Sequence, residues 1–191
     1  MNAARRSRSP ADPHRSEPLR LADGRELVIR PMHPNDIAPL AASFQLLNED
    51  EVRNRFLHVL KALSDEHLRQ LSQPIPGIDF VLVAAEPLPP GEALIVAVAR
   101  LSRDRDDTGR AEFGLLVSHF VVRLGLGRLL LDRLIQWAAG RGVKQIWGDV
   151  LIENLPMLTL AERVGFRRDP VLRSQGLVRI SLQVPTGKLR G

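Results

Sequence analysis

The order of extended and helical segments changes halfway along this chain, and that change constrains the fold more than any other feature. Three largely apolar segments follow one another, at 79–85, 93–101 and 111–117, with only loops between them. Extended segments joined by short loops pair antiparallel. From Gly125 onward, helical and extended patterns alternate instead. We therefore predict an α+β fold with a mixed sheet, antiparallel in its first half and β-α-β-α-β in its second half.

Hydrophobic periodicity places the remaining elements. Apolar residues three and four apart give the segments 125–141 and 155–164 one apolar face each, as expected of helices that flank a sheet. The other expected elements are strands at 25–30, 145–151 and 177–183, a helix that starts at Asn35 or Asp36, and helical stretches at 49–60 and 64–72.

One folded domain between two tails accounts for the chain. Residues 1–20 are rich in Arg, Ser and Pro without apolar periodicity, so we predict a disordered basic tail there, a domain at 21–184 and a short tail at 185–191. The apolar runs are too short to span a membrane. The absence of cysteine excludes disulfides and thiolate metal sites and fits a reducing compartment, so we expect a cytoplasmic protein.

The net charge of +5 raises the question of nucleic acid. Part of this charge lies in the tail, where five arginines outnumber two acidic residues. Only 4% of the residues are aromatic and none is tyrosine, which leaves few side chains for base stacking. A polyanionic small-molecule ligand would explain the mild positive charge of the rest of the chain equally well. The composition therefore argues against a nucleic-acid partner.

The segment Val-Arg-Leu-Gly-Leu-Gly-Arg at 122–128 lies between an expected strand and an expected helix. Gly125 and Gly127 allow the backbone to approach a ligand closely, and the helix that follows offers unpaired N–H groups and a positive dipole end. This arrangement suits a pyrophosphate, and Arg123 and Arg128 could add charged hydrogen bonds. A third glycine is absent, because position 130 is leucine, so the motif alone also fits a tight turn into a helix.

A second motif runs from Asn154 to Phe166. Asn154 has the position of an N-cap, Pro156 lies in the first turn of the helix, and Gly165 ends it. This structural role is sufficient on its own. A ligand contact by Asn154 needs support from elsewhere.

The order of these pieces resembles the GCN5-related N-acetyltransferases (GNAT) over residues 29–184, and more narrowly the bacterial protein-lysine acetyltransferases. The matching pieces are Arg-Asn-Arg-Phe at 53–56, Phe-Val-Leu-Val-Ala at 80–84, Ile-Val-Ala-Val-Ala-Arg at 95–100, Ala-Glu-Phe at 111–113, the glycine loop, and Asn-Leu-Pro-Met at 154–157 with Leu160 and Ala161.

The resemblance implies that acetyl-CoA lies between two splayed strands and donates its acetyl group to an amine. The implied cofactor contacts are the backbone of Leu115, Leu116 and Val117 for the thioester, the amides of Arg123, Leu124, Gly125, Leu126, Gly127 and Arg128 for the pyrophosphate, and Asn154 for the pantetheine arm. Glu112 matches the family's general base. A lysine-like amine is only about 0.1% neutral near pH 7.4, so a base makes chemical sense. Glu112 could also be a surface or salt-bridged glutamate.

Two positions depart from the family pattern. The first residue of the phosphate loop, usually Gln or Arg, is Val122, and the tyrosine that many relatives use as general acid is replaced by Ala161. We expect an N-acetyltransferase for a protein lysine or a small amine, without a metal because the histidines show no metal-ligand spacing. The alternatives are a non-catalytic acyl-CoA-binding regulatory module and, with least support, a nucleic-acid-binding protein. The sequence leaves open whether the protein forms a homodimer.

Overall fold

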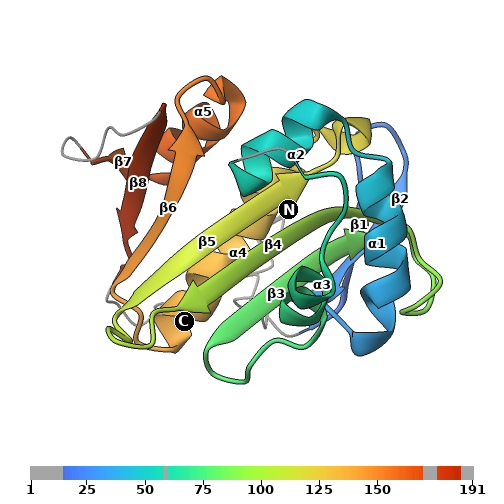
Figure 1. The fold of residues 1–191 in the computed structure, drawn as a ribbon, viewed down its shortest axis with the longest axis horizontal. Coiled ribbons are helices and arrows are strands. Elements are labelled where there is room, and N and C mark those ends of the chain that lie inside the picture. Colours follow the sequence, from blue (N-terminus) through green and yellow to red (C-terminus); the bar gives the residue numbers. More distant parts are fainter. Residues whose placement is uncertain (1–14, 58–59, 170–175, 186–191) are drawn as a thin grey trace, which may run out of the picture.

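Residues 15–57, 60–169 and 176–185 are described in a computed structural model of the chain, and eight strands within them form one sheet (Figure 1). The strands are β1 (Glu17–Arg20), β2 (Glu26–Pro31), β3 (Asp79–Ala85), β4 (Ile95–Arg103), β5 (Arg110–Val117), β6 (Gln145–Leu151), β7 (Arg167–Arg168) and β8 (Leu177–Gln183). The helices are α1 (Ile37–Gln45), α2 (Glu49–Phe56), α3 (Asp65–Ser72), α4 (Leu126–Gly140) and α5 (Leu155–Val164), with short 3₁₀ turns η1 (Pro34–Asp36) and η2 (His119–Val121).

The sheet has the order β1-β2-β3-β4-β5-β6-β8-β7, and β5 and β6 are its parallel pair. The other neighbouring pairs are antiparallel. Strands β1 to β5 lie side by side in chain order, although α1, α2 and α3 are inserted between β2 and β3. Helix α4 then makes the crossover that parallel strands require. The predicted α+β fold with a mixed sheet is confirmed.

Helices cover both faces of the sheet, as Figure 1 shows for α1 and α3 in front and α4 behind. Leu40 of α1 and Leu71 of α3 pack with Val81 and Val83 of β3. The larger cluster lies on the opposite face, where α4 and α5 pack on the other side chains of the central strands. Strand β3 is therefore buried on both faces, which explains its continuous apolar run.

Strands β5 and β6 separate soon after they begin. Their register pairs only Arg110, Ala111 and Glu112 of β5 with residues 145–147 of β6. Strand β5 continues to Val117 and β6 to Leu151 without further pairing to one another, and the two ribbons diverge in Figure 1. The sheet is therefore open in its middle, between its antiparallel half and its C-terminal strands.

Several element boundaries differ from those expected from the sequence. Helix α2 ends at Phe56 rather than at 60, because Leu57 adopts a left-handed conformation with φ of 64°, while 58–59 lie outside the described residues. Strand β4 continues past the expected end at 101 through Ser102 and Arg103, because both pair with β5. Pairing with a neighbour overrides the low strand propensity of charged residues.

The boundary of the N-terminal tail was wrong. Residues 1–14 lie outside the described residues, but Glu17–Arg20 form β1, which pairs with β2 along its whole length. Leu19 packs against the main core, and Arg133 of α4 is only 2% exposed while it pairs with Glu17 and donates to the main-chain oxygen of Arg15 at 3.2 Å. A four-residue edge strand with one apolar contact is too short to show a period in sequence. The C-terminal tail at 186–191 lies outside the described residues.

Substitution of Glu17 by alanine is expected to lower the free energy of unfolding by about 1–3 kcal/mol. The reason is that the buried guanidinium of Arg133 loses its carboxylate partner, although Glu17 itself is 50% exposed and water can replace part of the contact. Urea unfolding followed by circular dichroism measures the change. The matched control is Glu162→Ala, whose partner Arg168 is exposed, with an expected loss below about 1 kcal/mol. Equal losses in both variants would contradict the proposed role of Arg133.

Candidate active site

A pocket of about 710 Å³ lies where β5 and β6 diverge. Its walls come from β5, from the loop and first turn of α4, from β6 and α5, and from α2. The structure brings nearly all the residues proposed from the sequence into this pocket: Glu112, Leu115, Leu116, Val117, Arg123, Gly125, Leu126, Gly127, Arg128 and Asn154. Leu124 is the exception, because its side chain packs against the core instead.

The main chain of β5 exposes hydrogen-bonding groups to this gap. The N–H of Ser118 donates to the carbonyl of Val96 on β4 at 2.9 Å. Because hydrogen-bonding direction alternates along an antiparallel strand, Leu116 also turns its amide and carbonyl toward β4. Leu115 and Val117 turn theirs the other way, toward the gap that β6 has left. The geometry thus favours Leu115 and Val117 as backbone contacts, and Leu116 contributes its side chain.

The loop before α4 has the conformation of an anion-binding cradle. Arg123 and Gly125 both have positive φ, 63° and 82°, so the backbone adopts the left-handed conformation twice within three residues. Gly125 is the N-cap of α4 and offers no capping side chain, so the N–H groups of the first turn remain for a ligand or water. Successive N–H groups in such a turn, together with the helix dipole, attract phosphate oxygens. Arg128 and Arg123 are exposed at its rim.

Gly127 is required for space rather than for its backbone angles, since its φ is not positive. A Cβ at this position would lie 3.0 Å from Cδ2 of Leu160 and within 3.7 Å of the Leu115 and Val117 side chains. The first turn of α4 therefore packs closely against α5 and β5 in the wall of the pocket.

Asn154 has the capping role expected from the sequence. Its Oδ1 accepts the N–H of Met157 at 3.1 Å at the start of α5, and the residue also lines the pocket. The cap occupies the side-chain oxygen, so the NH₂ group is the part that remains for a ligand.

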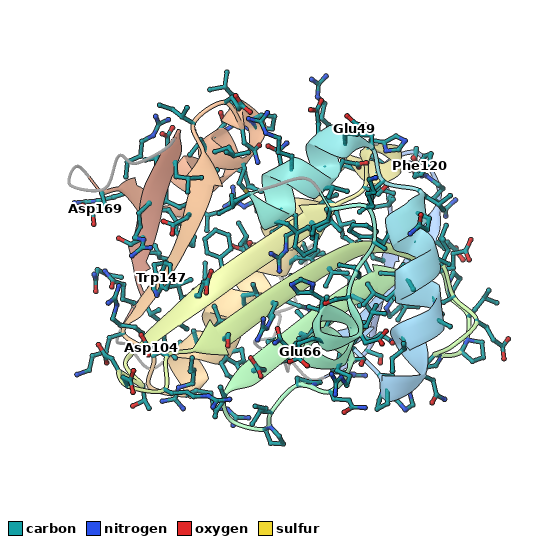
Figure 2. All side chains as sticks on the ribbon, in the orientation of Figure 1. Glu49, Glu66, Asp104, Phe120, Trp147 and Asp169 are labelled. Atoms are coloured by element: carbon teal, nitrogen blue, oxygen red, sulfur yellow. The ribbon has the colours of Figure 1, made fainter. Side chains whose placement is uncertain are left out.

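Glu112 is exposed on the face of the sheet that carries Gly114, Arg100 and Ser102. Asp149 of β6 lines the same end of the pocket and binds Arg179 through two hydrogen bonds of 2.8 and 2.6 Å. The hydrogen bond with Asp149 raises the pKa of Arg179, and Glu112 raises it further. Arg179 stacks on Trp147, 4.1 Å from the ring centroid to Cζ, on the part of the sheet where Figure 2 labels Trp147.

Helix α2 contributes a wall that sequence reasoning missed. Glu51, Asn54, Arg55 and Leu57 line the pocket. Glu51 accepts the backbone N–H of His119 and contacts its ring Nδ1 at 3.0 Å, so the start of α2 meets η2 near the labelled Glu49 and Phe120 of Figure 2. The similarity of residues 53–56 to the bacterial protein-lysine acetyltransferases was a sequence signal for this wall. It could not show which of these side chains faces the pocket.

Membrane-spanning helices and clusters of metal-ligating side chains are both absent from the described part of the chain. No helix there is long and apolar enough to cross a bilayer. Within the same residues, no three potential metal-ligating side chains gather in one place.

Solved structures share this fold. The GNAT domain of S. lividans PAT is 21% identical, with a TM-score of 0.77 over 92% of this chain and 99% of that one. A cAMP-binding acyltransferase from Mycobacterium smegmatis is 23% identical with a TM-score of 0.60, and this chain spans 48% of its length. YncA from Salmonella typhimurium, a putative acetyltransferase solved with its cofactor acetyl-CoA, is 21% identical with a TM-score of 0.63, covering 84% of this chain and 95% of that one.

The sequence profile of the Acetyltransferase (GNAT) family matches residues 46–166, which extend from the end of α1 through α5. The matched segment includes the parallel strand pair, the glycine loop and Asn154, and so contains most of the pocket wall. The chain therefore belongs to the GNAT family of acetyltransferases, enzymes that take their acetyl group from acetyl-CoA.

Proposed function

We propose that this protein transfers the acetyl group of acetyl-CoA to a primary amine, with a protein lysine as the preferred acceptor and Glu112 as the general base. The observation that carries the proposal is the continuity of the pocket, which extends from the phosphate-binding loop of α4, past the outward amides of Leu115 and Val117, to Glu112. A donor and an acceptor can therefore meet inside one cavity.

In the proposed complex, the pyrophosphate lies against the amides of residues 123–128. The pantetheine arm follows the edge of β5 and approaches the NH₂ group of Asn154. The thioester then reaches the level of Leu115, where a backbone N–H faces the gap. The thioester placement rests on the amides of Leu115 and Val117, which have no partner on β6 and are therefore available to a ligand.

The chemistry then needs one proton transfer. The acceptor nitrogen attacks the carbonyl carbon, a C–N bond forms, and Glu112 takes the proton that the nitrogen loses, directly or through water. The C–S bond breaks as the tetrahedral intermediate collapses, and CoA leaves as its thiolate. Glu112 is exposed at the acceptor end of the pocket, so its carboxylate is accessible to an incoming amine.

Two observations support a protein lysine over a small amine. The motifs at 53–56 and 154–157 resemble those of bacterial protein-lysine acetyltransferases. The S. lividans structure with the same fold is the GNAT domain of a protein named PAT. The decisive experiment incubates the protein with a cell extract, an amine panel and isotope-labelled acetyl-CoA, and identifies labelled products by mass spectrometry. Label on small amines alone would replace the lysine assignment.

A non-catalytic acyl-CoA-binding module is the second candidate, and Val122 is the observation that favours it. This residue lines the pocket with an exposed apolar side chain, where relatives place a polar one. Acetyl-CoA binding without turnover of any amine, over the whole panel, would support this candidate.

The pH dependence of turnover is expected to lack a descending limb between about pH 8 and 10. The chain has no tyrosine, and Ala161 is fully buried in α5, so no phenol can protonate the departing thiolate. A thiol with a pKa of about 8.5 leaves as its anion without such help. Turnover at saturating substrates should rise as the amine loses its proton and then level off. A reproducible bell-shaped profile, on protein shown to remain folded, would mean that another residue acts as the acid.

A further inference from the structure

Arg55 occupies an unusual position in the pocket wall. It lies in the last turn of α2, and its guanidinium rests on the backbone of Gly114 in the middle of β5. A Cβ added to Gly114 would lie 2.6 Å from Nη2, 2.7 Å from Cζ and 3.1 Å from Nε of Arg55. No other residue type at position 114 leaves room for this contact. Glycine weakens a strand interior, and it often marks such a close approach.

The charge of Arg55 is less compensated than those of its neighbours. Arg100 on β4 pairs with Asp79 at 2.9 Å, and Arg179 on β8 pairs with Asp149. Among the described residues, Arg55 has a cation–π contact with Phe56 at 5.0 Å but no hydrogen bond or ion pair. Burial lowers the pKa of Arg55 and Arg100 lowers it further, whereas Glu112 raises it. Its N–H donors are therefore available to a ligand that enters the pocket.

The position of Arg55 decides which ligand group it can reach. The anionic groups of CoA belong at the first turn of α4, beyond the far end of β5. Gly114 lies between Glu112, where the acceptor amine is activated, and Leu115, whose outward N–H marks the proposed thioester position. The group that lies there and gains negative charge during the reaction is the carbonyl oxygen of the thioester.

We propose that Arg55 is a catalytic residue that donates a hydrogen bond to the thioester carbonyl oxygen, together with the backbone N–H of Leu115. The inference rests on the proposed function, because it places acetyl-CoA in this pocket. When the amine attacks, the C=O electron pair moves onto this oxygen, and the fixed guanidinium stabilises the oxyanion. When the C–S bond breaks, the C=O bond reforms, so Arg55 neither gains nor loses a proton. Loss of one such donor lowers turnover by about 10²–10³-fold in other enzymes.

The test measures the carbonyl directly and needs no acceptor. Acetyl-CoA labelled with ¹³C at its carbonyl carbon is bound to the full-length protein, and the carbonyl resonance is recorded by NMR. A hydrogen-bond donor polarises the C=O bond and moves this resonance downfield. Arg55→Met should lose at least half of the downfield shift while acetyl-CoA affinity, by calorimetry, stays within about threefold. Turnover should fall by about 10²–10³-fold with little change in the acceptor KM.

Two further variants make the test specific. Arg53→Met removes the same charge from α2, but Arg53 pairs with Glu153 outside the pocket lining, so the resonance should match the wild type. Gly114→Ala keeps Arg55 but displaces its guanidinium, so it should reproduce the loss of shift and of turnover even if Arg55→Met does not fold.

The outcomes separate this inference from the function on which it rests. If acetyl-CoA binds and the resonance is unchanged in Arg55→Met and Gly114→Ala, the inference is wrong, even if turnover falls. A raised acceptor KM with an unchanged resonance would likewise overturn it, because Arg55 would then bind the acceptor. If the wild-type protein does not bind acetyl-CoA at all, the proposed function fails, and the inference fails with it.

Discussion

Gly127→Val is expected to abolish detectable acetyl-CoA binding and to leave the protein folded. A Cβ at position 127 would lie 3.0 Å from the end of the Leu160 side chain, and the two methyl groups of valine extend beyond that Cβ into the pocket wall. Leu160 can rotate to relieve the contact, so the fold tolerates the change. The pyrophosphate cannot then approach the first-turn amides of α4. Affinity should fall at least about 100-fold, or about 2.8 kcal/mol.

Isothermal titration calorimetry measures this loss, and circular dichroism shows whether the variant is folded. The matched control is Gly140→Val at the other end of the same helix, where a Cβ meets no neighbour within 4 Å. It makes the same substitution in the same helix without touching the pocket, so its affinity should equal that of the wild type. Wild-type affinity in folded Gly127→Val protein would place the pyrophosphate elsewhere.

Glu112→Gln should lower turnover by about 10²–10⁴-fold near neutral pH and leave acetyl-CoA affinity nearly unchanged. Glutamine keeps the shape of the side chain but cannot accept the proton of the attacking amine. Because Glu112 is exposed and lies on the opposite face of β5 from the buried Phe113, the change does not disturb the core. The loss should appear in kcat, since the carboxylate acts after the donor has bound.

Steady-state release of CoA, followed with a thiol reagent, measures the rate of Glu112→Gln. Glu92→Gln, an exposed carboxylate on the turn between β3 and β4, provides the control and should retain full activity. Unchanged turnover in Glu112→Gln would show that water or another acid serves as the base, and would remove Glu112 from the mechanism.

The sequence predicted those parts of the fold whose cause is local. Strand β3 has the expected bounds because a strand buried on both faces is apolar at every position. Helix α5 begins and ends where expected because Asn154 caps it and Gly165 takes the left-handed conformation at its end. Strand β1 was missed because its stability comes from pairing with β2 and from Arg133, which is more than a hundred residues away.

The same distinction holds for the site. The phosphate loop could be found from Gly125 and Gly127, because a positive φ at one position and limited space at the other both favour glycine. The contact between Arg55 and Gly114 could not be found in this way, because it depends on how α2 crosses β5. A glycine in a strand does not reveal which residue packs against it. Asp149 was missed for a related reason, as its partner Arg179 is on the strand next to β6. Whether Leu115 or Leu116 faces the gap required the register of β4.

The gap between β5 and β6 also bears on how long the protein survives in a cell. Within the described residues, β5 and β6 pair only at 110–112, next to two further backbone hydrogen bonds that the carbonyl of Gly109 accepts from Lys144 and Gln145. Beyond this pairing the two parts of the sheet are held by packing in the main core cluster rather than by strand hydrogen bonds. Segments with few backbone hydrogen bonds open more readily, and opened segments are where proteases cut. A donor bound along β5 would replace part of the missing ladder, and a ligand at 100 times its Kd adds about 2.7 kcal/mol to the stability of the folded state. Under the proposed function, a cell with little acetyl-CoA would therefore degrade the protein sooner.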